Sequence, residues 1–160
     1  MVDKAQTGMQ GVFLVAAELS GLGFIVSPTS RGAFGADLLV TDQHCKRAWS
    51  VQVKTNRLPA SFWLMNKHTK DLTSEIHVYV FVNMNGKKPP SYYVVKSAFV
   101  AEKVYEQETK SGTWYSFDRS DAKPHLDAWN EVFGVTVPVA AKPSESLGED
   151  TPAVSEPGAL

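Results

Sequence analysis

Between residues 35 and 55 the chain carries a carboxylate, an amide and an ammonium group that together suit hydrolysis of a phosphodiester. They belong to Asp37, in the segment GADLLV (35–40), and to Gln52 and Lys54, in the segment SVQVKT (50–55). A carboxylate and a neutral oxygen can bind Mg²⁺, which takes one or two carboxylates from a protein and keeps several waters. Such a metal acidifies a bound water, and a lysine beside it can orient or deprotonate that water or stabilise the transition state.

The fold has to bring these three groups together, and a hairpin would do so. We expect strands at residues 36–40 and 48–55, joined by a polar turn. Alternation along the second strand places Ser50, Gln52 and Lys54 on one face. If the hairpin is centred between His44 and Cys45, Asp37 pairs with Gln52. The alternative is an ordinary cross-strand pair of Asp37 and Lys54 with Gln52 exposed beside it.

This arrangement resembles the PD-(D/E)xK nuclease-like superfamily, which includes Holliday-junction resolvases, many restriction enzymes and some homing endonucleases. The resemblance covers roughly residues 8–100 and is nearest to small bacterial and phage members of unknown function. It implies a restriction-endonuclease-like α/β fold, with a mixed central sheet flanked by helices and an opening helix before the motif hairpin. It also implies Mg²⁺ or Mn²⁺ as cofactor, Asp37 and Gln52 as metal ligands with the Val53 carbonyl, and Lys54 as the catalytic lysine.

Two positions depart from that family's pattern. The usual acid of the second motif is Gln52, although glutamine occurs there in some active members. Relatives often carry a Gly-Glu pair in the opening helix, whereas this chain has Gly11-Val12. Glu18 lies about 240° further around that helix and is expected to face solvent. A catalytically degenerate nuclease fold that binds nucleic acid or protein is therefore the alternative function, and a purely structural α/β domain is a third.

The charge is divided unevenly along the chain, whose net charge is −1. Residues 136–160 hold four acids, one base and no aromatic residue, so we expect a disordered acidic tail after a folded domain at residues 1–135. The domain keeps the other fifteen bases and thirteen acids, and residues 43–70 contain no acid. Bases interleaved with aromatic residues suit contact with a nucleic-acid backbone. The candidates for DNA contact are Arg31, Arg57, Lys67 and Lys70.

Periodicity and turn residues predict a mixed α/β domain built around a sheet. We expect helices at 7–20, 97–105 and 123–133, and strands at 24–26, 36–40, 48–55, 76–83 and 91–95. Residues 114–117 read as an edge strand, and residues 62–70 as a loop with a helical turn. Phe62 and Trp63 are expected in the core. His77 is interpreted as a buried histidine, with a supporting role near the metal as the alternative.

Several classes of protein are excluded or disfavoured. A single cysteine, Cys45, excludes an intramolecular disulfide and a cysteine-built zinc site. The longest apolar runs fall well short of the ~20 residues that span a bilayer. The first residues show no secretory signal, so a cytoplasmic location is expected. DNA is the expected partner, and because the relatives often dimerise, a homodimer is an open alternative that no residue pattern predicts.

Overall fold

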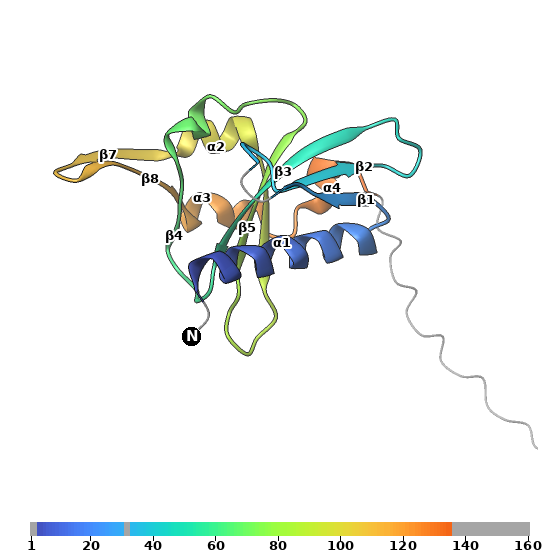
Figure 1. Cartoon of the computed structure of the whole chain (residues 1–160), viewed down its shortest axis with the longest axis horizontal. Helices are drawn as coiled ribbons and strands as arrows, with labels where there is room; N and C mark the ends of the chain where they lie inside the picture. The colour runs from blue at the N-terminus through green and yellow to red at the C-terminus, as the bar shows by residue number, and fades with distance from the viewer. Residues whose placement is uncertain (1–2, 31–32, 136–160) are drawn as a thin grey trace, which may run out of the picture.

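The structure is a computed structural model that describes residues 3–30 and 33–135. Its centre is a five-stranded sheet with helices on both faces, and a hairpin projects from one side (Figure 1). The predicted tail at 136–160 lies outside the described residues, and so does Arg31. The prediction of a mixed α/β fold is confirmed.

The main sheet has the strand order β1-β2-β3-β5-β6. Its strands are β1 (Ile25–Pro28), β2 (Leu38–Thr41), β3 (Ala48–Asn56), β5 (His77–Asn83) and β6 (Ser91–Lys96). β3 and β5 are parallel, and the other neighbouring pairs are antiparallel. Every residue of β5 is buried, as its near-continuous apolar sequence predicts for a central strand. β3, which carries Gln52 and Lys54, therefore lies in the interior of the sheet.

Helix α1 (Lys4–Gly21) covers one face of this sheet. A capping box opens it: Asp3 Oδ1 accepts from Gln6 N at 2.7 Å, and Gln6 Oε1 accepts from Asp3 N at 3.0 Å. At Gly11 the helix approaches β3 so closely that an added Cβ would lie 1.9 Å from Thr55 Oγ1. The sequence therefore needs glycine at the point where α1 crosses the site-bearing strand.

The two faces of the sheet carry separate apolar cores. Valines of β3 and β5 pack with α1 and with Trp129 and Phe133 of α4 (Trp129–Phe133) in the first core. Helix α4 ends at Gly134, whose φ of 66° is the left-handed conformation that favours glycine. The second core joins Tyr79 and Phe81 of β5 to Trp63 and Phe117 and to α2 (Ser97–Lys103) and α3 (Arg119–Ala122).

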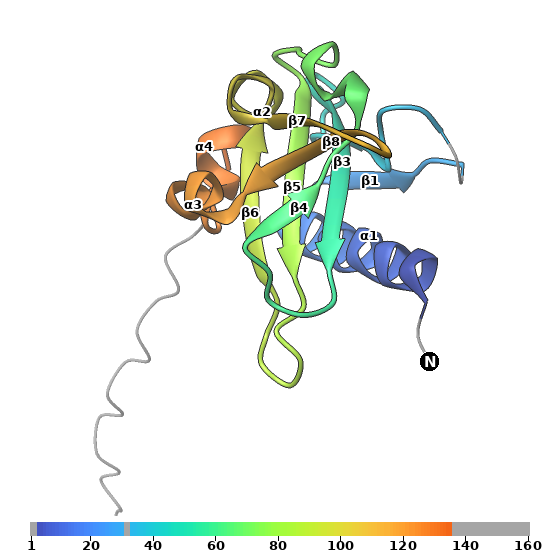
Figure 2. The same ribbon diagram turned by 90° about the vertical axis from the view of Figure 1, so that its left-hand side faces the viewer.

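A second, three-stranded sheet lies over that other face, with the strand order β4-β8-β7 (Figure 2). Its strands are β4 (Phe62–Leu64), β7 (Tyr105–Thr109) and β8 (Gly112–Asp118), all antiparallel. Trp63 Nε1 donates to the Val82 carbonyl at 3.1 Å, which ties β4 to the main sheet. The strand β4 therefore forms a wall over the face that carries Gln52 and Lys54.

Three predicted elements are corrected here. The strand predicted at the sheet edge is β8, the middle strand of the second sheet, because β7 pairs on its other side. The helix predicted at 97–105 ends at Lys103, since Tyr105 begins β7. The helix predicted at 123–133 is interrupted. A 3₁₀ turn, η2 (Lys123–His125), precedes a bridge between Leu126 and Tyr93, and Asp127 has φ 51°.

The ambiguous segment 62–70 contains both β4 and a 3₁₀ turn, η1 (Lys67–Lys70). Asn66 caps η1 by accepting from His68 N at 3.0 Å. Among the helices of the described residues, none combines the length and the apolar character that a bilayer crossing requires.

Candidate active site

The hairpin of β2 and β3 has the register that the sequence predicts. Leu38 pairs with Val51 and Thr41 with Ala48, and one further step places Asp37 opposite Gln52. Asp37 N donates to the Val51 carbonyl at 2.8 Å, so the ladder continues one residue beyond the start of β2. Asp37 therefore lies at the end of the hairpin, where its side chain can reach the backbone of β3.

The Asp37 carboxylate is fixed by two donors from β3. Its Oδ2 accepts from Gln52 Nε2 at 3.0 Å and from the Val53 backbone N–H at 2.7 Å. Because β2 begins at Leu38, no backbone carbonyl of β2 lies opposite the Val53 N–H. The Asp37 carboxylate accepts the hydrogen bond that such a carbonyl would otherwise accept. The Val53 carbonyl leaves the strand on the same side as its N–H, as in any extended residue. A carboxylate and a backbone carbonyl thus converge at the end of β2.

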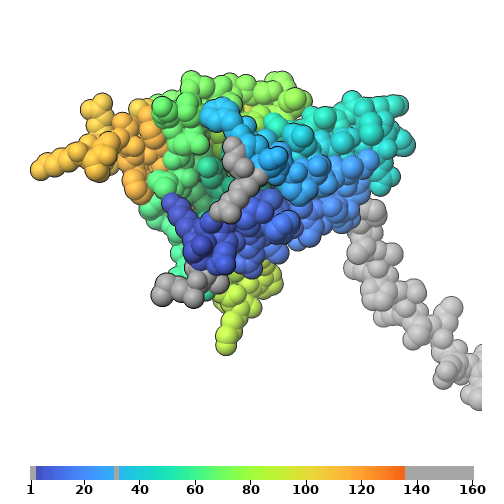
Figure 3. All heavy atoms as spheres, viewed as in Figure 1, coloured from blue at the N-terminus to red at the C-terminus, as the bar shows by residue number. Residues whose placement is uncertain are grey.

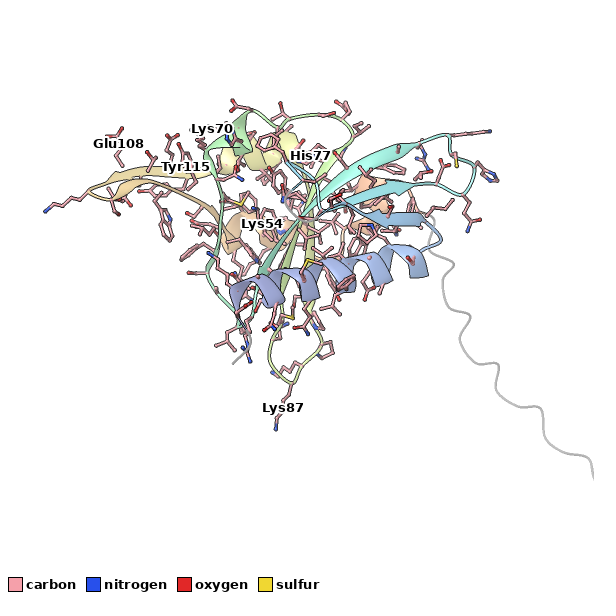
Figure 4. The ribbon with its side chains drawn as sticks, viewed as in Figure 1. Lys54, Lys70, His77, Lys87, Glu108 and Tyr115 are labelled. Carbon is pink, nitrogen blue, oxygen red and sulfur yellow. The ribbon has the colours of Figure 1, made fainter. Side chains whose placement is uncertain are left out.

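Lys54, labelled in Figure 4, lines a cleft of about 300 Å³, and the Asp37 carboxylate is close enough to act on its charge. The cleft is bordered by the N-terminal end of α1, through Lys4 and Gly8, and by β4, through Trp63 and Leu64. In Figure 3 that end of α1 (dark blue) and the β4 segment (green) lie beside each other on the viewed face. Burial lowers the pKa of the Lys54 ammonium group. Asp37 acts in the opposite direction and Lys4 adds to the lowering.

The donor set suits a weakly held divalent metal. Asp37 supplies one carboxylate, the Val53 carbonyl faces the same side, and Gln52 adds an amide oxygen once its side chain turns, since Nε2 now faces Asp37. Within residues 3–30 and 33–135, no group of three His, Cys, Asp or Glu side chains has metal-binding geometry. One carboxylate and two neutral oxygens leave most positions of a Mg²⁺ ion to water, which that ion tolerates well.

Two further titratable residues, His77 and Tyr79, lie on the same face of the sheet. His77 pairs with Ser50 in the register of β3 and β5, and Ser50 Oγ lies 2.8 Å from His77 Nδ1. Burial lowers the pKa of His77, and its Nε2 is buried without a partner among the described residues. Burial also raises the pKa of Tyr79, which pairs with Gln52. The predicted buried histidine is confirmed, and its partner is the Ser50 that alternation had placed beside Gln52.

The helix position that carries an acid in the resembling family contributes only packing here. Val12 is buried in the first core, on the face of the sheet opposite Gln52 and Lys54. Glu18, on the same helix, is exposed. Burial, with Glu18 as the second cause, raises the pKa of Tyr92 to about 12. Tyr92 packs in the first core, so Glu18 also lies away from the cleft, as its helical angle predicts.

Of the basic residues predicted to contact DNA, the three that the structure describes do not line the cleft. Arg57 is exposed and lines a separate cavity of about 430 Å³ with Gln10 and Lys88. Lys67 and Lys70 are exposed on η1, and Lys70 Nζ lies 2.5 Å from Glu106 Oε2 of β7. Figure 4 shows Lys70 near Tyr115, on the side of the β7–β8 hairpin. The charge of Lys70 is thus already matched by an acid.

Sequence reasoning missed Lys4, whose charge acts on Lys54, and the contribution of β4 to the cleft. No pattern around Lys4 could have placed it, because it lies about fifty residues before Lys54 and reaches the cleft only through the crossing of α1 over β3. For β4 a signal existed, since Phe62-Trp63-Leu64 is apolar, but it is too short to separate from a loop.

Comparisons with known proteins find likeness in structure alone. No family model matches the chain, and no curated protein matches its sequence. A Holliday junction resolvase, Hjc, from Archaeoglobus fulgidus superposes with a TM-score of 0.54 at 13% identity, covering 82% of this chain and 98% of the resolvase. A bacterial homing endonuclease, I-Ssp6803I, superposes with a TM-score of 0.56 at 12% identity, covering 84% of this chain and 94% of the endonuclease. The chain therefore has the restriction-endonuclease-like nuclease fold that the family resemblance implies.

Proposed function

We propose that the chain is a metal-dependent nuclease of the PD-(D/E)xK type that hydrolyses DNA phosphodiester bonds at Asp37, Gln52 and Lys54. The observation that carries the proposal is the contact of Gln52 Nε2 with Asp37 Oδ2 at 3.0 Å, with Lys54 two residues further along β3 and on the same face. Both structural neighbours are nucleases by name, which supports the reaction class.

Asp37 and the Val53 carbonyl would hold Mg²⁺ or Mn²⁺, with Gln52 as a neutral third ligand. When bound, such a metal supplies an acidified water and positive charge against the phosphate. The chain's own residues do the rest. The N–H groups of Val53 and Gln52 fix the orientation of the Asp37 carboxylate. Because burial lowers its pKa, Lys54 can exchange a proton with a neighbouring water nearer to neutral pH than an exposed lysine can.

Cleavage of supercoiled plasmid, a four-way junction and single-stranded DNA in Mg²⁺, Mn²⁺ or EDTA tests this function. We expect metal-dependent cleavage that falls by about a hundredfold or more in Lys54→Ala and Asp37→Asn, since loss of a proton-transfer group costs roughly 10²–10⁴ in rate. Lys87→Ala, an exposed lysine in the loop between β5 and β6 (Figure 4), is the matched control and should cleave as the wild type does. Cleavage that survives both cleft substitutions would overturn the assignment.

A second candidate function is a nuclease-fold module that binds nucleic acid or protein without catalysis. Two observations favour it. Asp37 is the one carboxylate of the proposed site, and none of the described residues that line the cleft itself is an acid. The helix position of the family acid is the buried Val12. This candidate predicts no cleavage of any of the three substrates in any metal. It also predicts DNA binding that weakens steeply with salt, as phosphate contacts do.

A further inference from the structure

The outer face of the second sheet carries large apolar side chains that no core covers. The pairing of β4, β8 and β7 places Phe62, Leu64, Trp114 and Tyr105 on one face of that sheet. They are 37%, 42%, 40% and 52% exposed, respectively. The same pairing places Glu106 and Glu108 of β7 on the opposite face, where Glu106 pairs with Lys70 and Tyr115.

Two of these rings form a contact at the centre of the face. The Phe62 and Trp114 rings lie edge to face with centroids 5.7 Å apart. Ser116, which shares this outer face in the register, is only 5% exposed, as expected if the rings close over it. Aromatic rings held in this way present apolar surface at little cost in side-chain entropy, which is what a stacking platform for bases requires.

A basic cavity adjoins the platform. It measures about 530 Å³ and is lined by Ser61, Asp118, Arg119, Ser120 and Lys123 among others. It is contiguous with the platform because Ser61 precedes Phe62 and accepts from Arg119 N at 2.7 Å, while Asp118 pairs with Phe62. Arg119 Nε is buried and has no hydrogen-bond partner among the described residues. Because that nitrogen is buried, a phosphate would contact the terminal N–H groups of the guanidinium. Two cations against one acid give the cavity a net positive charge that suits a phosphate group.

The platform also reaches the candidate active site. Leu64 belongs to the outer face of β4 and lines the cleft that holds Lys54. Asn56 Nδ2, from the same cleft, donates to the Phe62 carbonyl at 2.8 Å, which ties the platform strand to the end of β3. A nucleic-acid strand bound along Phe62 and Leu64 could therefore continue into the cleft while staying in contact with the protein surface.

We propose that the outer face of β4, β8 and β7 binds unpaired nucleotides of a DNA strand, with bases stacking on Phe62 and Trp114 and a phosphate in the cavity of Arg119 and Lys123. The proposal extends the proposed function, on which it rests, to a class of substrate: DNA with a single-stranded segment next to the cleaved phosphate. Aromatic rings beside a cationic cavity fit a base and the phosphate next to it, which alternate along a single strand.

Binding measured by fluorescence anisotropy in EDTA separates this proposal from catalysis. The probes are a labelled oligothymidine of about twelve nucleotides, an abasic strand of equal length that has the same phosphates but no bases, and a duplex. We expect Phe62→Ala and Trp114→Ala to weaken binding of oligothymidine by roughly five- to a hundredfold, the range typical of a lost base stack. Neither substitution should change the weaker binding of the abasic strand.

Three further variants serve as controls. Arg119→Gln should weaken binding of oligothymidine and of the abasic strand alike, because it removes a phosphate contact. Trp114→Phe keeps a ring and should retain most of the affinity, which guards against misfolding of Trp114→Ala; circular dichroism of each variant provides a second check. Phe13→Ala removes an exposed ring, 57% accessible, from α1 and should bind as the wild type does.

The proposal is overturned if no probe binds, or if Phe62→Ala and Trp114→Ala bind oligothymidine as the wild type does. It is also overturned if these two substitutions weaken binding of the abasic strand as much as binding of oligothymidine. A dimer in sedimentation that Trp114→Ala dissociates would overturn it too, since the face would then bind a second copy of the chain. If Trp114→Ala cleaves DNA and binds oligothymidine as the wild type does, the platform is refuted and the proposed nuclease function stands. If the wild type binds oligothymidine in a base-dependent way but cleaves no substrate, the platform stands and the proposed nuclease function is refuted.

Discussion

Lys54 is the residue at which the proposed chemistry and the stability of the fold oppose each other. Its side chain lies in a cleft walled by α1 and β4, where burial lowers the pKa of its ammonium group although Asp37 is close by. A buried charge that its partner does not fully compensate costs free energy of folding. Such a residue is typical of a functional site, because a lysine of lowered pKa can transfer a proton.

Lys54→Met is therefore expected to stabilise the fold by roughly 0.5–2 kcal/mol at pH 7 while abolishing cleavage. The pKa of Lys54 is lower in the folded chain than its ordinary value of 10.5. Between those two values the unfolded chain binds more protons, so the stability of the wild type rises with pH through that window. The advantage of Lys54→Met should shrink accordingly as the pH approaches 10.5.

Urea denaturation at several pH values from 7 to about 10 measures both effects. Lys67→Met is the control, because Lys67 is exposed on η1 and its replacement should change the free energy of unfolding by less than about 0.5 kcal/mol. A Lys54→Met variant that is less stable than the wild type at pH 7 would contradict this account of the cleft.

Most of the candidate site could be predicted from residues alone, and the reason is geometric. Alternation in an extended strand fixes that Ser50, Gln52 and Lys54 share a face, and the centre of a short polar turn fixes that Asp37 lies opposite Gln52. The orientation of the Gln52 amide toward Asp37 could not be predicted, since it depends on which hydrogen bonds the carboxylate leaves open.

At the scale of elements, the crossing of α1 over β3 positions the cleft. Gly8 lines the cleft, and Gly11 lies one turn later, against Thr55. Thr55 is β-branched and stiff, so it cannot easily yield to a larger neighbour. The absence of a side chain at Gly11 therefore allows the short distance between α1 and β3. That distance in turn determines how far Lys4 lies from Lys54.

Gly11→Ala should destabilise the fold by about 1–3 kcal/mol, the usual cost of overpacking, because its Cβ would meet Thr55 Oγ1 at 1.9 Å. Gly8→Ala is the matched control on the same helix. It meets nothing within 4 Å and should stabilise α1 by about 0.5–1 kcal/mol, since alanine has the higher helix propensity. Thermal or urea unfolding of both variants measures the difference. Equal effects of the two substitutions would show that the crossing tolerates a methyl group.

The elements that sequence reasoning missed are those whose structure depends on partners. The strand β7 has no buried residue, so its sequence carries no periodic apolar signal, and it forms by pairing with β8. The interruption after His125 follows from the bridge of Leu126 to Tyr93, a contact between segments more than thirty residues apart. The long elements α1 and β3 bury a regular face and β5 buries every residue, so all three could be predicted from their own residues.

At the scale of the molecule, bases and acids are distributed between two parts of the chain. Residues 136–160 contain Lys142 and the four acids Glu145, Glu149, Asp150 and Glu156, while the remainder carries fifteen bases and thirteen acids. The net charge of the whole chain is −1, and that of the first 135 residues is +2. The sign of the net charge that a DNA strand meets at residues 1–135 therefore depends on the charge of the last 25 residues.

Removing residues 136–160 should strengthen binding of DNA a few-fold at ~50 mM salt, because it removes a net charge of −3. It should leave the free energy of unfolding unchanged, because a proline-rich segment with four acids and no aromatic residue has little apolar surface to bury. The gain should vanish near ~0.5 M salt, where screening reduces interactions beyond a few ångströms. Anisotropy of a labelled duplex across a salt series measures it. A full-length variant with the four acids replaced by Gln and Asn should bind like the shortened chain. If it instead binds like the wild type, the last 25 residues act by something other than charge.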